Sequence, residues 1–155
     1  MAKKTETQKI TQIKKIIKEL LGHLQIKAEV KTTLDNDIYQ IQLEPEDPGI
    51  LIGYHGETLR ALQRIVSMII YRLRGEWVRI IINVGDYRQR RQETLEKMAF
   101  AAAQKARFSK EAQNLPPMPP AERRIIHITL AKETDVETSS EGEGKNRYVV
   151  VRPKV

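Results

Sequence analysis

The 155-residue chain contains no cysteine, so it offers neither disulfides nor thiolate ligands for a metal. No apolar run approaches the roughly 20 residues that a membrane-spanning helix needs. The first residues also lack the apolar stretch of a secretory signal peptide. We therefore expect a cytoplasmic protein without membrane insertion.

Residues suited to catalysis are also scarce. The chain has three histidines, and no acid–base pair or metal-ligand spacing stands out. The sequence has no Walker-type phosphate loop, so no motif in it supports nucleotide hydrolysis. We predict a binding protein and not an enzyme, with no catalytic residue, no metal and no cofactor.

The composition is that of an ordinary globular protein, with 40% hydrophobic and 30% charged residues. The formal net charge of +7 favours polyanions as partners. The positive excess lies in the first 35 residues and in residues 86–155. The two ends of the chain are therefore the basic parts.

Hydrophobic periodicity and turn residues predict six elements in the first half. They are a helix over residues 10–24 with Gly22 as its C-cap, strands over 26–30 and 39–43 around a turn at 35–37, a helical turn over 49–52 capped by Asp47, a helix over 59–73, and a strand over 77–84. We expect the first two strands to form a hairpin. The predicted order is αββααβ.

The second half begins with a helix from the N-cap Asp86 to residue 109, followed by a short strand over 111–115. Residues 121–132 are ambiguous, because apolar alternation favours a strand while the preceding prolines favour a helix start. We predict a helix here, and then strands over 136–139 and 148–151. The fold class is thus α+β, with two small αβ domains over residues 1–85 and 86–155.

The tetrapeptide Gly53-Tyr54-His55-Gly56 lies between the predicted helical turn and the next helix. Its glycines allow a sharp turn and leave backbone amides open to a phosphate at a helix N-terminus, where the dipole favours negative charge. A G-x-x-G pattern also arises by chance. By itself it leaves a phosphate-binding loop and a plain helix–helix connection as alternatives.

The sequence around this loop makes the pattern more specific. Residues 50–52, the loop and residues 57–63, which include Arg60, resemble the K-homology (KH) domain in its bacterial, type II order. The resemblance implies that the loop clamps about four nucleotides while bases lie along an adjacent apolar groove. KH loops commonly carry Lys or Arg between the glycines. Here Tyr54 can stack on a base and His55 can add charge below neutral pH; the alternative is a weak loop or a protein contact.

Arg123 and His127 are four residues apart and share one face of the predicted helix. Alone, the pair is more typical of an exposed arginine and a structural histidine. With the segment 140–147 and a closing strand, it resembles the R-x-x-x-H domain, a small sheet packed on two helices that binds single-stranded nucleic acid. The resemblance implies that Arg123, His127, Lys145 and Arg147 contact nucleic acid, with Arg forming a fork on phosphate. We expect Arg123 and His127 on an exposed helix face.

A third group of candidates, Arg88, Arg90 and Arg91, opens the long helix of the second half. A run of charge is often a plain solvated face. Its position at the domain junction also allows a basic track between the two candidate sites. We therefore include the three arginines among the predicted nucleic-acid-binding residues.

The two motifs in succession, with the junction 85–88 and the proline-rich stretch 115–124, resemble the bacterial Jag family, the SpoIIIJ-associated proteins also called KhpB or EloR. The resemblance covers nearly the whole chain, although members usually carry an additional N-terminal Jag domain that is not found in this sequence. It implies a role in cell elongation, division and cell shape. It also implies a second KH protein, KhpA, as partner.

Two functional hypotheses follow. The first is binding of single-stranded RNA, with single-stranded DNA as the alternative ligand, in post-transcriptional regulation linked to cell elongation or division. The second is a protein-interaction scaffold, in which the KH surface pairs with another KH protein and nucleic acid is secondary. The salt dependence of binding separates the two, because phosphate contacts release counterions. The target RNA, any base preference and the oligomeric state do not follow from the residues.

Overall fold

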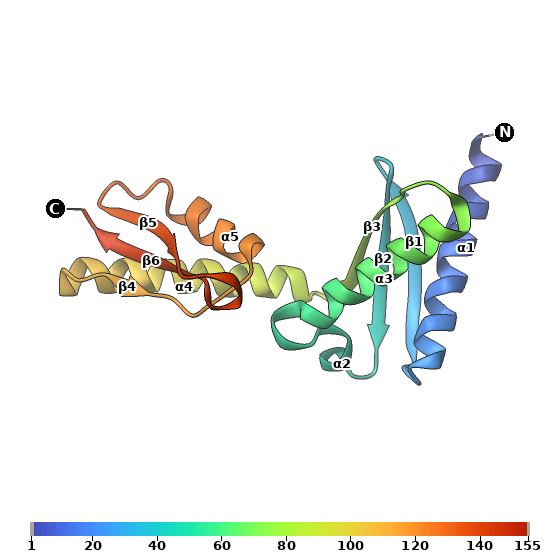
Figure 1. Ribbon diagram of the computed structural model, residues 1–155, viewed down its shortest axis with the longest axis horizontal. Helices are drawn as coiled ribbons and strands as arrows, with labels where there is room; N and C mark the ends of the chain where they lie inside the picture. Colours follow the sequence, from blue (N-terminus) through green and yellow to red (C-terminus); the bar gives the residue numbers. More distant parts are fainter. Residues whose placement is uncertain (1, 155) are drawn as a thin grey trace. The chain divides into compact units, whose positions relative to one another are not determined.

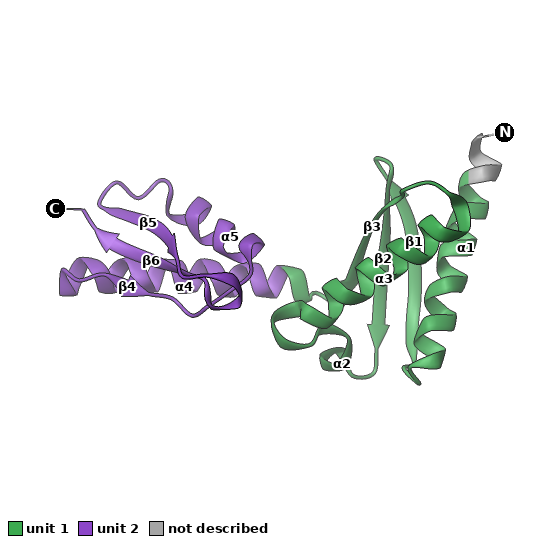
Figure 2. Cartoon of the chain, viewed as in Figure 1, with its two compact units in different colours: residues 1–88 green, residues 89–155 purple. Residues whose placement is uncertain are grey.

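The computed structural model describes residues 2–154, and the side chains of residues 6–154. The chain folds into two compact units, residues 1–88 and 89–155 (Figure 2). The sequence predicted a boundary between residues 85 and 86, which is the turn before the long helix. Within the described residues, no helix is both long enough and apolar enough to cross a bilayer.

Unit 1 has the predicted order αββααβ (Figure 1). Its elements are α1 (Ala2–His23), β1 (Ala28–Asp35), β2 (Ile38–Pro45), α2 (Pro48–Ile52), the 3-10 turn η1 (Tyr54–Gly56), α3 (Glu57–Arg74) and β3 (Arg79–Val84). The sheet order is β1-β2-β3, in which β1 and β2 form the predicted antiparallel hairpin and β2 and β3 are parallel. The strand β3 is therefore an edge strand.

Helices α1 and α3 bury their apolar faces in one core with the sheet. In β2, alternate residues are buried, as the period of a half-buried strand requires. The buried residues are Ile13, Ile17 and Leu21 from α1, Val30 from β1, Tyr39, Ile41 and Leu43 from β2, Leu51 from α2, Leu59, Leu62, Val66 and Ile70 from α3, and Ile80, Ile82 and Val84 from β3. This core fixes α3 against the sheet and so positions its outer face.

The end of α1 corrects one prediction, because Gly22 is not the C-cap. The residue in the left-handed conformation is Gln25, with φ of +58°. The amides of Gln25 and Ile26 donate to the carbonyls of Gly22 (3.0 Å) and Leu21 (2.9 Å), which is the Schellman pattern of a helix C-terminus. The turn falls at this place because Ile26 then packs against the same core as Leu21.

Several strand boundaries also differ from the prediction. β1 begins at Ala28 rather than at residue 26 and continues to Asp35. β3 begins at Arg79, because Trp77 stacks on the ring of Tyr71 instead of joining the strand. In the second unit, the penultimate strand was predicted to end at Ser139 and continues to Glu141.

Unit 2 consists mainly of two helices and a small antiparallel sheet. Its elements are α4 (Tyr87–Ser109), whose first two residues belong to unit 1, β4 (Gln113–Asn114), α5 (Pro120–Leu130), β5 (Val136–Glu141), the 3-10 turn η2 (Gly144–Asn146) and β6 (Tyr148–Pro153). The sheet order is β4-β6-β5. The predicted helix over residues 121–132 is confirmed, with its start at the prolines.

The core of unit 2 is built around small side chains on α4. Ala99, Ala102, Ala103 and Ala106 are buried there, and their size lets the other elements approach α4 closely. The larger buried residues are Leu95 of α4, Ile126 and Leu130 of α5, Val136 of β5, and Val149 and Val151 of β6. α5 is thereby held against β5, with its polar face turned partly toward that strand.

Candidate nucleic-acid interface

The loop between α2 and α3 is a tight turn that depends on its two glycines. The Asp47 carboxylate accepts a hydrogen bond from the Gly49 amide (3.0 Å) and starts α2, as predicted. Gly53 and Gly56 have φ values of +67° and +77°. A Cβ on Gly53 would lie 2.0 Å from Oγ1 of Thr58. The loop backbone therefore lies directly against the start of α3.

The side chains between the glycines form a stacked pair. The rings of Tyr54 and His55 lie 4.1 Å apart, centroid to centroid, with an angle of 11° between their planes. Tyr54 is 73% exposed, and His55 has a φ of +48°. The loop thus presents an aromatic surface at the place where the family pattern has a basic residue.

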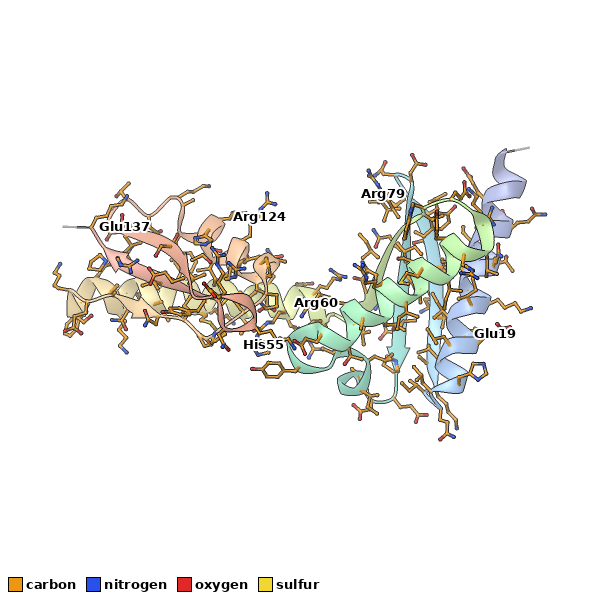
Figure 3. All side chains as sticks on the ribbon, in the orientation of Figure 1. Glu19, His55, Arg60, Arg79, Arg124 and Glu137 are labelled. Carbon is orange, nitrogen blue, oxygen red and sulfur yellow. The ribbon has the colours of Figure 1, made fainter. Side chains whose placement is uncertain are left out.

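A positive charge is nevertheless held at this loop by α3. Nη1 of Arg60 donates a hydrogen bond to the carbonyl oxygen of His55 (2.9 Å). Figure 3 shows both residues at the same end of α3. Arg60 therefore supplies the cation that the loop itself lacks.

Next to Arg60 is a cleft of about 620 Å³ between α3 and the region of the edge strand β3. Arg60, Gln63, Arg64 and Ser67 of α3 line one wall, and Val78 and Arg88 also contribute. Gln63 and Arg64 follow Arg60 by three and four residues, so all three share one helix face. Sequence reasoning missed Gln63 and Arg64, although this spacing from Arg60 was a signal that could have found them.

Side chains in this cleft bind the edge of the sheet. Oε1 of Gln63 accepts hydrogen bonds from the Ile82 amide (3.1 Å) and from Nη2 of Arg88 (3.2 Å). Nη2 of Arg88 also donates to the Ile82 carbonyl oxygen (3.2 Å). The backbone donor and acceptor of one edge-strand residue are thus occupied by two long polar side chains.

The electrostatics of the cleft favour an anion. Although much of the Arg88 side chain is exposed, burial of its guanidinium lowers its pKa, Tyr87 opposes this effect, and the charge of Arg60 lowers the pKa further. An arginine guanidinium nevertheless stays protonated near neutral pH. Two like charges held near one another repel, and a bound phosphate would relieve that repulsion.

In unit 2, three predicted residues meet on one face of β5. Nη1 of Arg123 donates to Oγ of Ser140, and Nε of Arg147 donates to the same oxygen at 3.1 Å. Nδ1 of His127 is hydrogen-bonded to Oγ1 of Thr138 at 2.7 Å. The two pairs of residues are spaced alike. Arg123 and His127 are four residues apart on a helix, which is a rise of about 6 Å, and their partners are two residues apart on a strand, which is about 6.6 Å.

This arrangement corrects the expectation that Arg123 and His127 lie on an exposed helix face. Both are half-buried and hydrogen-bonded to β5, and Nε of Arg123 also donates to the Met118 carbonyl (3.2 Å). Burial, and then the charge of Arg123, lower the pKa of His127 below its ordinary value of 6.5. The imidazole is therefore neutral at neutral pH. The strand was predicted to end before Ser140, which is why that residue was missed.

The remaining predicted residues have different surroundings. Lys145 is exposed in η2, two residues before Arg147, and Arg90 is exposed on α4. Arg91 is bound to the carboxylate of Glu122. Within the described residues, no three His, Asp or Glu side chains are grouped as a metal site.

Comparisons with known families agree with this division into two units. Residues 11–82 match the family model described as "KhpA/KhpB, KH domain", and residues 93–153 match that of the R-x-x-x-H domain. The fold and the two sites therefore define a protein with a KH domain followed by an R-x-x-x-H domain.

Curated relatives identify the family. Proteins named "RNA-binding protein KhpB" are 40% identical over 114 residues in Clostridium symbiosum (74% of this chain, 51% of the relative) and 33% identical over 146 residues in Streptococcus pneumoniae serotype 2 (90% and 44%). The Bacillus subtilis protein of that name is 31% identical over 147 residues (94% and 71%). The chain belongs to the KhpB family, as the sequence motifs predicted. It spans about half the length of the first two relatives.

Proposed function

We propose that the chain binds single-stranded nucleic acid, with RNA as the main ligand, and that it binds rather than catalyses. The relatives carry the name RNA-binding protein, and both domain types are nucleic-acid-binding modules. The observation that carries the proposal is Arg60, which holds a charge on the loop carbonyl at one end of a cleft that Arg64 and Arg88 also line.

In unit 1 the sugar-phosphate backbone of the nucleic acid passes along the loop, and the bases of the nucleic acid enter the cleft. The loop precedes the N-terminus of α3, an end of a helix that favours phosphate. Arg60 then binds a phosphate next to the loop. A base in the cleft competes with Gln63 and Arg88 for the amide and carbonyl of Ile82.

In unit 2 two guanidinium groups converge on one oxygen, Oγ of Ser140. A phosphate oxygen accepts the same donors and adds a negative charge, which makes such hydrogen bonds stronger. The proposed ligand therefore binds beside Ser140, between Arg123 and Arg147. Lys145, exposed on the adjacent turn, adds charge for the neighbouring phosphates.

The test compares one RNA sequence in single-stranded and in fully paired form at fixed salt, and then varies the salt. We expect the single strand to bind more tightly, and its affinity to fall steeply with salt because phosphate contacts release counterions. Equal or tighter binding of the duplex would refute the proposal.

A second candidate function is pairing with another KH protein such as KhpA, and one observation favours it. Ile65 and Leu73 of α3 are 47% and 59% exposed, and the half-buried Ile69 lies between them on the same helix face. Adjacent exposed apolar side chains on a helix are typical of a protein interface. Ile65→Glu should abolish pairing with a co-expressed KH protein, measured by size-exclusion chromatography, and should leave single-strand binding unchanged. Loss of both activities would speak against separate surfaces.

On the family resemblance we further propose a cytoplasmic location and a regulatory role in cell elongation or division. A deletion strain should then show cells of altered length or shape. A variant of Arg60 and Arg123 that no longer binds RNA should reproduce that phenotype. Cells of normal shape in the strain whose variant no longer binds RNA would separate the cellular role from RNA binding.

A further inference from the structure

Trp77 is the single tryptophan of the chain, and it lies on the surface between α3 and β3. It is 68% exposed. Its ring stacks on Tyr71, in the last turn of α3, with 4.4 Å between centroids and 15° between planes. Tyr71 is itself 42% exposed. Leaving two stacked aromatic side chains in water forgoes the free energy of burying them, which indicates a surface for a ligand.

The position of Trp77 relates it to the loop. The residue lines the same cleft as Arg60, Arg64 and Arg88. From Arg60 to Tyr71 the helix rises about 16 Å. Figure 3 shows Arg79, two residues after Trp77, at the start of β3 and well away from His55. The tryptophan is therefore at the end of the cleft that is remote from the loop.

The charges around Trp77 favour binding of a nucleic acid in the arginine-lined cleft. Three of the residues that line the cleft are arginines, whereas a second cavity that Trp77 also borders is lined by charges of both signs: Glu6, Asp37 and Glu76 with Lys9 and Arg79. The neighbouring Glu76 is paired with Lys9 (2.8 Å) and Arg74 (3.2 Å), and these hydrogen bonds hold the pKa of its carboxyl below the ordinary value. A phosphate backbone that follows the arginines is thus not opposed by an unpaired Glu76.

We propose that Trp77, braced by Tyr71, is a stacking platform for a base several nucleotides away from the loop. Stacking needs no hydrogen-bond readout, because every base has a π-face, and the platform lengthens the bound strand without specifying its sequence. The exposed indole provides the flat surface, Tyr71 holds its plane, and the arginines bind the backbone between the loop and the platform. This inference rests on the proposed function, and it adds a second binding site in unit 1.

The single tryptophan makes the test direct, since its fluorescence reports on this site alone. The full chain is titrated with single-stranded oligoadenylate of about four and about twelve nucleotides, and the anisotropy of an end-labelled copy reports binding independently. We expect the longer strand to quench Trp77 and to protect it from acrylamide. The shorter strand, which covers only the length that a KH loop clamps, should bind without quenching.

Two variants complete the test. Trp77→Ala should lower the affinity for the longer strand roughly tenfold and leave the affinity for the shorter strand unchanged, while Trp77→Phe should retain most of the affinity for the longer strand. Thermal unfolding of both variants checks that the substitutions do not alter the fold.

Binding of the longer strand without quenching, and with equal affinity in Trp77→Ala, would overturn the platform and leave the proposed function standing. No binding of either strand would overturn both. Fluorescence that changes with protein concentration in the absence of RNA would assign the surface to a second copy of the chain and overturn the platform.

Discussion

Arg91 on α4 donates two hydrogen bonds, both 2.9 Å long, to the two carboxylate oxygens of Glu122 on α5. Glu122 is only 6% exposed although it is charged. A bidentate pair of this kind satisfies both groups, and loss of one partner leaves the other charge buried without compensation. The pair therefore ties α5, which carries Arg123 and His127, to the long helix.

The first prediction concerns this pair. Arg91→Ala should lower the free energy of unfolding by about 3 kcal/mol, because Glu122 would remain buried and unpaired. Lys97→Ala, an exposed position on the same helix, is the matched control and should change it by less than about 0.5 kcal/mol. Urea unfolding measures both. A stable Arg91→Ala protein with weakened RNA binding would instead assign Arg91 to the nucleic acid, as its position in the basic run suggested.

The second prediction concerns the cluster on β5. Replacing Arg123 and His127 by Ala should weaken single-strand binding and also lower the free energy of unfolding by about 2 kcal/mol, since two side-chain hydrogen bonds to the strand are lost. Binding is measured at a temperature where every variant is folded. Ser140→Ala is the control, because it removes the shared acceptor and keeps all the charges. If Ser140→Ala loses as much affinity for the single strand as the double variant, the arginines contribute to binding only by stabilising the fold.

The third prediction concerns pH. The pKa of His127 is lowered in the folded protein, so below the ordinary value of 6.5 the unfolded chain binds a proton that the folded chain does not. The free energy of unfolding should therefore fall as the pH drops below that value, with no such loss above it. Urea unfolding between about pH 7.5 and about pH 5.5 measures the slope.

His127→Gln keeps a hydrogen-bonding group near Thr138 and cannot take up the proton. Its unfolding should be less sensitive to pH over the same range. Identical slopes in the two proteins would show that His127 titrates equally in the folded and unfolded chains.

The fourth prediction concerns the loop. Replacing Tyr54 and His55 by Asp places two negative charges where phosphate approaches, and should weaken RNA binding roughly tenfold or more. Asp tolerates the positive φ of His55, so the loop keeps its shape. The same double replacement by Asn separates charge from shape and should cost less, while Tyr54→Lys should strengthen binding. If the Asp and Asn proteins bind equally well, the loop does not contact phosphate.

Local patterns in the sequence determined most of the architecture. The spacing of apolar residues and the turn residues predicted the order αββααβ, the hairpin and the helix that carries Arg123 and His127. The motifs Gly53–Gly56 and Arg-x-x-x-His predicted both candidate sites. These features depend on residues a few positions apart, whose preferred conformations and shared faces follow from the helix and strand periods.

Only the tertiary structure decided which long side chains meet. Arg91 lies in a run of arginines, but its partner Glu122 is 31 positions away. Gln63 and Arg88 meet at Ile82, and Trp77 leaves the predicted strand to stack on Tyr71. Long polar and aromatic side chains have several rotamers and reach several neighbours, so the packing of whole elements selects the contact that forms. The sequence alone therefore determined the elements and the motif positions, and the packing of those elements decided which charges stay open to a ligand.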